Sequence, residues 1–255
     1  MNLSDITPLI LTWNEEPNLR RCLERLHWAR QVIVIDSGST DATTSIISEY
    51  SNVTLVTRSF DDHTSQWNFG VDTVSSLWVL SLDSDYVLGD GFEQELSRLP
   101  LTQDVHAYFA AFRYLVFGKP LRACLYPPRA ALFRKDRCHY EADGHTQLLR
   151  IAGASGMLTT RIDHDDRKPL SRWITSQDNY AKLEAAKLLA SDKESLRPQD
   201  RLRLSGWAAV PATFIYTLFV KRTLLDGWHG WFYALQRTFA EILLSLRLLE
   251  KRLDS

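Results

Sequence analysis

Two carboxylates separated by one residue follow an apolar segment in the first half of the chain. Residues 78–82 contain no proline or glycine and are typical of a buried strand, and Asp83 and Asp85 come directly after them. Ligands of open α/β sheets bind beyond the carboxyl ends of the strands. Mg²⁺ is often held there by one or two carboxylates and by phosphate oxygens of a substrate. The pattern predicts a site for Mg²⁺ or Mn²⁺ and a diphosphate, although an isolated Asp-x-Asp is more often a solvated turn.

Polar loops also follow two earlier predicted strands, at residues 6–12 and 31–35, and helical patterns follow at 17–28 and 42–50. Strands that alternate with helices predict βαβ units and a parallel sheet, so these loops should lie at the same edge as Asp83. Neither loop carries G-x-G-x-x-G, which disfavours a dehydrogenase-type dinucleotide site. Loops rich in Asp, Asn, Ser and Thr can instead hydrogen-bond a base and a ribose.

Composition limits the class of protein. The 255 residues include 45% hydrophobic and 24% charged residues, as in ordinary folded domains. Three separated cysteines without a C-x-x-C spacing argue against a disulfide framework and a zinc site, and they fit a reducing, cytosolic environment. The first residues lack the basic and apolar pattern of a secretory signal.

The C-terminal region is basic and aromatic. Residues 197–255 contain nine Lys/Arg and five Asp/Glu. Residues 204–220 carry no charge, but they include Gly206 and Pro211 and fall short of the ~20 residues of a spanning helix. Residues 235–253 have the pattern of a basic amphipathic helix, which predicts association with an anionic membrane surface. The alternative is that these helices pack on the catalytic domain or on a second subunit.

The three polar strand ends read Thr12-Trp13-Asn14-Glu15, Asp36-Ser37-Gly38-Ser39-Thr40-Asp41 and Asp83-Ser84-Asp85. Together they resemble the motifs of glycosyltransferase family 2, the inverting sugar-nucleotide enzymes. The chain is most similar to the branch of bacterial lipopolysaccharide-core glucosyltransferases. The resemblance implies a GT-A fold, which is a Rossmann-like mixed sheet flanked by helices, here with a C-terminal helical region that associates with the membrane. It predicts a catalytic domain at 1–196, with a donor half at about 1–100 and an acceptor half at about 101–196, and a helical region at 197–255.

The resemblance also implies roles for individual residues. Asp85 would hold the metal on the diphosphate, with Asp83 facing the ribose or sugar and His164 as a further metal or phosphate contact. Helix capping is the alternative for Thr12 and Glu15, and turn formation is the alternative for Asp36. Relatives often carry an acid directly after the second Asp, where this chain has Tyr86. The expected donor-binding residues are Thr12, Asn14, Glu15, Asp36, Gly38, Arg58, Gln66, Asn68, Asp83 and Ser84.

An inverting transfer needs one general base for the acceptor hydroxyl. Asp143 is the first choice and Glu141 the second, since the adjacent Gly144 permits close approach of a ligand and a partly desolvated carboxylate has a raised pKa. Further contacts to the acceptor or to phosphate are expected from Arg122, Arg129, His145 and Arg167.

The sequence thus predicts a metal-dependent inverting glycosyltransferase. Its donor would be a nucleotide sugar, UDP-sugars being favoured, and its acceptor a lipopolysaccharide-core, polysaccharide or lipid-linked hydroxyl. The enzyme would be cytoplasmic and peripheral at the cytoplasmic face of the inner membrane. Both a monomer and a homo-oligomer are compatible with the sequence, and no nucleic-acid partner is expected. The alternatives are a nucleotidyltransferase, or a catalytically silent scaffold on the membrane.

Overall fold

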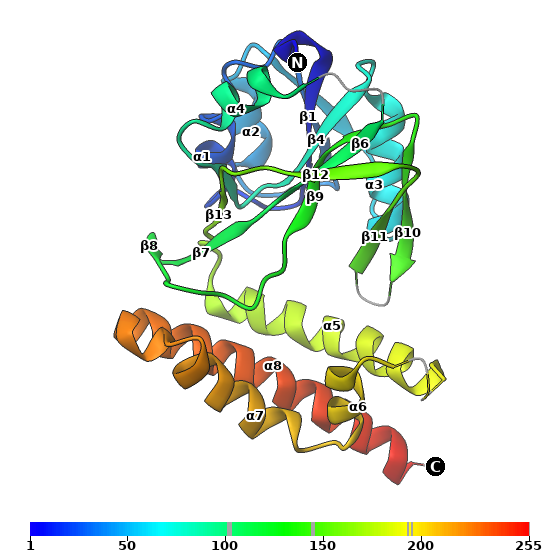
Figure 1. Ribbon diagram of the computed structural model, residues 1–255, viewed down its shortest axis with the longest axis vertical. Helices are drawn as coiled ribbons and strands as arrows, with labels where there is room; N and C mark the ends of the chain where they lie inside the picture. The colour runs from blue at the N-terminus through cyan, green and yellow to red at the C-terminus, as the bar shows by residue number, and fades with distance from the viewer. Residues whose placement is uncertain (101–103, 144–145, 193, 195, 255) are drawn as a thin grey trace. The chain divides into compact units, whose positions relative to one another are not determined.

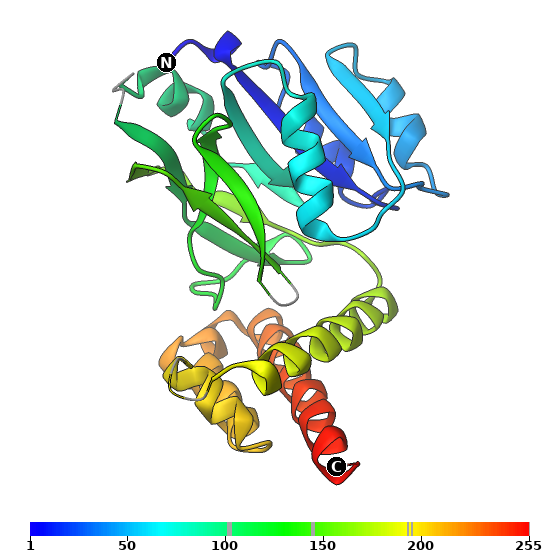
Figure 2. The same ribbon diagram turned by 90° about the vertical axis from the view of Figure 1, so that its right-hand side faces the viewer.

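The computed structural model describes residues 1–100, 104–143, 146–192, 194 and 196–254. These residues form two compact units (Figures 1 and 2). The first unit comprises residues 1–115, 126–142 and 146–167, and the second comprises residues 116–125, 143 and 168–254. The predicted domain boundary at residue 196 stays a prediction.

A seven-stranded sheet with the order β12-β6-β9-β4-β1-β2-β3 forms the centre of the first unit. Strands β1 to β4 are parallel where they pair, whereas β9 runs antiparallel to both β4 and β6. The predicted mixed sheet is therefore confirmed. The strands are β1 (Ile6–Thr12), β2 (Val32–Asp36), β3 (Val53–Thr57), β4 (Trp78–Asp83), β6 (Val105–Ala110), β9 (Arg129–Arg134) and β12 (Ala154–Met157).

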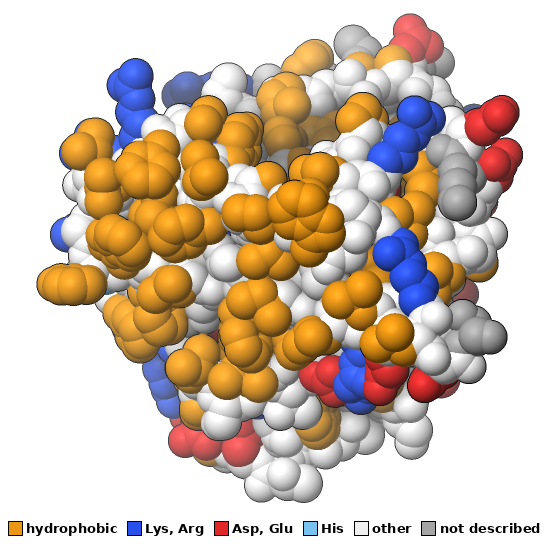
Figure 3. All heavy atoms as spheres, turned by 90° about the horizontal axis from the view of Figure 1, so that it is seen from below, with side chains coloured by type: hydrophobic (Ala, Val, Ile, Leu, Met, Phe, Trp, Pro, Cys, Tyr) orange, Lys and Arg blue, Asp and Glu red, His pale blue; other side chains and the backbone are white. Residues whose placement is uncertain are grey.

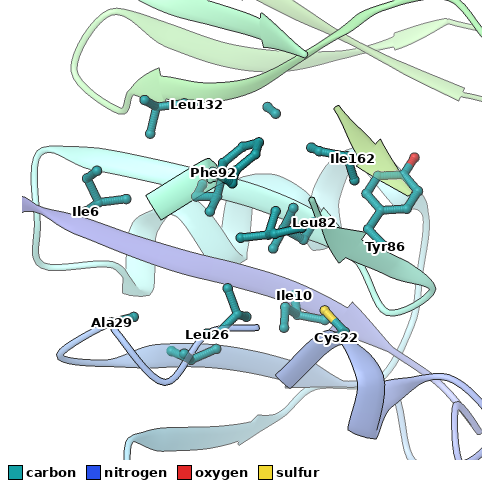
Figure 4. Packing of buried hydrophobic residues seen from close by; sticks show 14 of the residues in the cluster. Ile6, Ile10, Cys22, Leu26, Ala29, Leu82, Tyr86, Phe92, Leu132 and Ile162 are labelled. Atoms are coloured by element: carbon teal, nitrogen blue, oxygen red, sulfur yellow. The ribbon is translucent and has the colours of Figure 1, made fainter. Parts of the chain in front are cut away.

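Helices cover both faces of this sheet, because neighbouring residues of its strands point to opposite sides. Ile10 and Leu82 pack with Phe92 on one face of the sheet, which is covered by α1, α2 and α4 (Figure 4). Leu9 and Val79 pack on the other face, that of α3. Both faces are buried, which accounts for the continuous apolar runs in the sequence. The helices are α1 (Leu19–Leu23), α2 (Thr43–Ser48), α4 (Phe92–Arg98) and, on the second face, α3 (His63–Thr73).

Smaller elements complete the first unit. They are η1 (Leu3–Asp5), β5 (Tyr86–Leu88), β7 (Phe112–Val116), β10 (Cys138–Asp143), β11 (Thr146–Ile151) and β13 (Ile162–His164). Strands β10 and β11 form a hairpin. Strand β13 pairs antiparallel with β5 and parallel with β7, which sets His164 opposite both Tyr86 and Tyr114.

The second unit is mainly helical. Its core joins Ala181, Ala185 and Leu188 of α5 to Leu244 and Leu248 of α8. Residues 170–190 form one long helix, α5, and the uncharged segment 204–220 is broken into several short elements. Within the described residues, no helix is both long enough and apolar enough to cross a bilayer. The elements are β8 (Lys119–Pro120), α5 (Leu170–Ala190), α6 (Pro198–Leu204), α7 (Ala209–Ile215), the π-helical turn η2 (Tyr216–Val220), η3 (Thr223–Asp226) and α8 (Trp228–Leu253).

The carboxylate of Glu95, in the first turn of α4, binds the segment that precedes β13 through hydrogen bonds. It accepts hydrogen bonds from the backbone N–H groups of Thr159 and Thr160 at 2.6 and 2.8 Å, and from the Thr159 hydroxyl at 2.8 Å. Burial acts to raise the pKa of Glu95, but these hydrogen bonds outweigh it and the pKa is lowered. The ionised group therefore stabilises the fold above its unfolded pKa of ~4.3, and the contribution is lost as the pH falls through the folded value.

We therefore expect Glu95→Gln to lower the free energy of unfolding by about 1 kcal/mol at pH 7, because an amide replaces an ionised acceptor. The loss should begin to shrink below the unfolded pKa of ~4.3 and should disappear as the pH falls through the lower pKa of the folded protein. Urea unfolding at pH 7 and at pH 3 measures both values. Glu93→Gln, in the same helical turn, is the matched control and should change stability little at either pH.

Candidate functional site

The carboxyl ends of β1, β2 and β4 lie side by side in the sheet (Figure 1). The register sets Thr12 opposite Asp36 and Leu11 opposite Asp83. The hydroxyl of Ser84 donates to the carbonyl oxygen of Leu11 at 2.8 Å and so ties the loop after β4 to β1. The three predicted motifs therefore meet at one edge of the sheet.

Asp36 shapes the loop after β2. Its buried carboxylate accepts from the backbone N–H groups of Gly38 and Ser39 at 3.0 and 2.9 Å, and from the Ser39 hydroxyl at 2.5 Å. Gly38 has φ 84°, a left-handed conformation that glycine adopts at little cost. The turn-forming role considered as the alternative for Asp36 is thus present, and it makes the loop rigid.

The loops after β1 and β2 are interlocked through Asn14. Its side-chain oxygen accepts hydrogen bonds from the backbone N–H groups of Thr40 and Asp41. The backbone N–H of Asn14 donates to the Ser39 hydroxyl at 2.7 Å. The next residue, Glu15, donates its backbone N–H to the Thr43 hydroxyl at 2.7 Å. Asn14 itself has φ 54°, a strained conformation that this network maintains. The two polar loops therefore form a single rim beside the strand ends.

Arg58 and Gln66 belong to the same edge. The backbone N–H of Arg58 donates to the carbonyl oxygen of Asp36 at 2.9 Å, and its guanidinium pairs with Asp61 and with the Gln66 side chain. Gln66, which is fully buried, donates to the Ser37 hydroxyl at 3.1 Å. Both residues therefore border the rim, and their predicted contact with the donor nucleotide stays a prediction.

The structure gives Asn68 a structural role that the sequence did not suggest. Its amide donates to the carbonyl oxygen of Tyr140 at 2.9 Å and accepts from the Tyr140 backbone N–H at 3.0 Å. The side chain thereby joins α3 to β10 in the manner of a neighbouring strand. Its predicted contact with the donor nucleotide stays a prediction.

The buried Asp85 and the partly buried His164 form a pair next to the rim. The Nε2 atom of His164 lies 3.3 Å from an oxygen of Asp85. Burial disfavours the charged imidazolium, but the negative charge of Asp85 outweighs this effect and raises the pKa of His164. The other ring nitrogen, Nδ1, is buried and has no hydrogen-bond partner among the described residues. The carboxylate of Asp85 and the imidazole of His164 can thus form an ion pair, or their oxygen and nitrogen atoms can bind a ligand.

The pair fits a hard divalent cation in part. Two donors bound to one octahedral ion at ~2.1 Å lie ~3 Å apart, close to the separation of Asp85 and His164. Asp83 accepts no hydrogen bond through its carboxylate within the described part of the chain. However, no three His, Cys, Asp or Glu side chains among the residues that the structure describes are arranged to hold an ion between them. The expected three-residue set is therefore not preassembled, and phosphate oxygens would have to complete the shell.

Three tyrosines surround His164, with ring centroids 5.3 Å (Tyr86), 4.8 Å (Tyr114) and 5.1 Å (Tyr126) from the imidazole. The hydroxyl groups of Tyr86 and Tyr126 are 2.6 Å apart. The Arg129 guanidinium stacks 4.8 Å from the Tyr126 ring. In place of a further carboxylate, Tyr86 therefore contributes to an aromatic wall around His164, which sequence analysis missed because its members come from four separate segments.

The two candidate bases differ in environment. Glu141 lies in the first unit, where it pairs with Arg150 at 2.7 Å and with His139 at 3.1 Å. Hydrogen bonds from Arg150 and His139 lower the pKa of Glu141, so the expectation of a raised pKa is wrong for this residue. Asp143 belongs to the second unit and pairs with Lys187 at 2.6 Å. His145 lies outside the described residues.

Two of the predicted phosphate or acceptor contacts are engaged by carboxylates. Arg167 pairs with Asp165 at 2.7 Å. Arg122, in the second unit, pairs with the buried Asp226 at 3.1 Å. Each guanidinium is thus positioned by an ion pair, and an anionic ligand would compete with that pair.

Comparisons with known proteins agree with this arrangement. Residues 9–120 match the family model described as Glycosyl transferase family 2. The lipopolysaccharide core biosynthesis glycosyltransferase LpsC of Rhizobium meliloti is 25% identical over 197 residues, covering 74% of this chain and 73% of LpsC. An uncharacterized glycosyltransferase of Rickettsia felis is 21% identical, covering 99% of this chain and 92% of that protein.

Solved structures are more distant. S. aureus TarS in complex with UDP-GlcNAc is 12% identical with a TM-score of 0.49, covering 98% of this chain and 91% of TarS. Glucosyl-3-phosphoglycerate synthase from Mycobacterium tuberculosis, in complex with Mn²⁺, UDP and phosphoglyceric acid, has a TM-score of 0.46 at 12% identity and covers 74% of this chain and 80% of that one. The family match over residues 9–120, the glycosyltransferase relatives and the mixed sheet flanked by helices agree with one another, and this part of the chain is similar to family 2 glycosyltransferases.

Proposed function

We propose that the protein transfers a sugar from a nucleoside-diphosphate donor, UDP-sugars being favoured, to a hydroxyl of a glycan acceptor. The observation that carries the proposal is the meeting of Thr12, Asp36 and Asp83 at neighbouring strand ends. The rigid polar rim beside them supplies hydrogen-bonding groups for a base and a ribose. The pyrophosphate would lie against Asp83 and the Asp85–His164 pair.

A divalent cation, Mg²⁺ or Mn²⁺, is part of this proposal. Asp85 and His164 would hold it, with Asp83 close to the sugar or ribose, and donor phosphate oxygens would complete the shell. When bound, the cation would neutralise the charge that develops on the departing nucleoside diphosphate. The tyrosines around His164 exclude water from one side of the pair, which strengthens its electrostatic interactions.

Transfer would proceed with inversion. A carboxylate takes the proton of the acceptor hydroxyl while its oxygen bonds to the anomeric carbon, and the bond from that carbon to the diphosphate breaks on the opposite face. Asp143 remains the preferred base. Glu141 is a weaker candidate, since its lowered pKa makes it a poorer proton acceptor.

The proposed acceptor is a lipopolysaccharide-core or other lipid-linked glycan, and the proposed location is the cytoplasmic face of the inner membrane. The 25% identity to LpsC supports the first statement. Exposed apolar side chains on the second unit, described below, support the second.

Donor binding is testable by thermal shift. If the nucleotide is supplied at about 100 times its dissociation constant, binding contributes ~2.7 kcal/mol, which corresponds to a rise in Tm of roughly 5 °C or more. UDP with Mn²⁺ should produce this rise in the wild-type protein, and EDTA should abolish it. Asp83→Asn should remove most of the shift.

Asp90→Asn is the matched control, because Asp90 is an exposed aspartate of the same unit whose partner is Arg25. It should keep the full shift. An equal shift in Asp83→Asn would show that the donor site lies elsewhere.

A further inference from the structure

The second unit carries a large exposed apolar surface. More than half of the exposed large apolar side chains that the structure describes lie between residues 207 and 253. Figure 3, in which the molecule is seen from below, shows hydrophobic side chains gathered in a broad patch with charged side chains of both signs at its margin. Soluble domains rarely expose apolar patches of this kind without a partner. We call this surface the apolar face: Trp207, Ile215, Tyr216, Phe219, Val220, Leu224, Leu225, Trp228, Leu235, Phe239, Ile242, Leu246, Leu249 and Leu253.

Helix α8 supplies half of the apolar face. Its exposed apolar residues recur every three or four positions from Leu235 to Leu253, so they form one stripe along the helix. Its buried residues, such as Ala234, Leu244 and Leu248, lie between them in the sequence and face the core of the unit. The helix is therefore apolar on two sides, and only one of these is covered by the protein.

The turn between η2 and α8 is flanked by two exposed aromatic side chains of the apolar face. Phe219 and Trp228 are 55% and 84% exposed. The turn is held from within, since the buried Thr223 hydroxyl donates to the carbonyl oxygen of Thr217 at 2.9 Å. Gly230 packs so closely on the Thr223 carbonyl that a Cβ atom would not fit. A rigid base thus presents exposed aromatic groups, which lowers the entropy cost of binding through them.

Basic residues outnumber acidic residues along the apolar face. Lys221 and Arg222 lie at the tip of the turn, where Arg222 has φ 58°. Between residues 207 and 253, Asp226 and Glu241 are buried and pair with Arg122 and Arg203, whereas Glu250 is exposed and pairs with Arg247 at 2.9 Å. Six Lys/Arg against three Asp/Glu over residues 207–253 leave this part of the chain with an excess of positive charge.

We propose that the apolar face lies in the interface of a bilayer that contains anionic lipid, with Phe219 and Trp228 inserted and Lys221 and Arg222 at the headgroups. Aromatic side chains favour this depth, and basic residues add attraction to anionic lipid. A second copy of the chain fits less well, because a two-fold interface centred on this turn would bring like charges together. The inference concerns attachment and goes beyond the transfer reaction.

Vesicle flotation tests the proposal without donor or acceptor, so its result does not depend on the proposed catalytic function. The full chain should float with vesicles of phosphatidylglycerol and phosphatidylcholine and bind pure phosphatidylcholine more weakly. Phe219→Ser with Trp228→Ser should lower the partition coefficient at least about tenfold, because two large apolar groups no longer leave water. Phe60→Ser with Leu77→Ser, at exposed apolar positions of the first unit, is the matched control and should bind like wild type.

A second pair of substitutions tests the charge contribution. Lys221→Gln with Arg222→Asn should reduce binding to the anionic vesicles about 25-fold, at about fivefold per cation, and should leave binding to neutral vesicles nearly unchanged. Circular dichroism verifies that each variant is folded. Failure of the wild type to bind anionic vesicles would overturn the proposal. So would a dimer in sedimentation velocity that Phe219→Ser with Trp228→Ser dissociates, because the apolar face would then join two copies.

Discussion

Replacing Asp85 with asparagine is expected to lower the rate of sugar transfer by about a thousandfold. The substitution keeps the size of the side chain and removes its charge, so the buried contact with His164 can persist while the proposed cation loses its principal ligand. A metal ion contributes several kcal/mol of charge stabilisation to such a reaction, and ~4 kcal/mol corresponds to a factor of a thousand. Release of nucleoside diphosphate from a nucleotide sugar, followed in the presence of acceptor membranes, measures the effect.

Two controls make the Asp85→Asn result interpretable. The thermal unfolding midpoint of the variant should stay within a few degrees of wild type, which separates loss of chemistry from loss of fold. Asp90→Asn should retain wild-type activity. If Asp85→Asn kept more than a tenth of the activity, the proposed role of this carboxylate would be wrong.

Substitution of Gly230 by alanine is expected to destabilise the second unit severely. A Cβ atom at this position would lie 1.7 Å from the carbonyl oxygen of Thr223 and 2.7 Å from its carbon. Backbone atoms cannot move aside as a flexible side chain can, so either α8 or the turn before it must shift. Overpacking of this kind costs on the order of 3 kcal/mol or more, which corresponds to a fall in Tm of roughly 10 °C.

The matched control is Gly91→Ala. Gly91 has φ 85°, but a Cβ atom there would meet nothing within 4 Å. Its cost should be limited to backbone strain of about 1 kcal/mol. Calorimetry of the full chain compares the two variants, and equal effects would show that contact with Thr223 is not what requires a glycine at position 230.

Local signals in the sequence predicted the central part of the fold. The strands that end at Thr12, Asp36 and Asp83 are apolar, short and followed by polar loops, so the ends of β1, β2 and β4 could be predicted closely. The helices were predicted less well. For example, the pattern at 17–28 gave a longer helix than α1, because its apolar spacing continues through turns that also face the core.

The contacts between distant segments could not be predicted. The wall around His164 joins β5, β7, β13 and the segment before β9, and no periodicity in the sequence links them. Asn68 looked like a ligand-binding residue, whereas its amide pairs with the backbone of Tyr140. Glu141 looked partly desolvated, yet Arg150 and His139 pair with it. Partners of polar side chains depend on tertiary structure, which residue type and spacing do not specify.

Electron paramagnetic resonance of Mn²⁺, recorded with and without UDP, would test whether the strand-end carboxylates form a metal-dependent nucleotide site. The protein alone should bind Mn²⁺ weakly, because its described residues offer no cluster of three ligands. Addition of UDP should produce one tightly bound ion per chain in wild type and in Asp90→Asn, and none in Asp85→Asn. Binding of UDP with equal affinity in EDTA, or an unchanged Mn²⁺ signal in Asp85→Asn, would contradict this assignment.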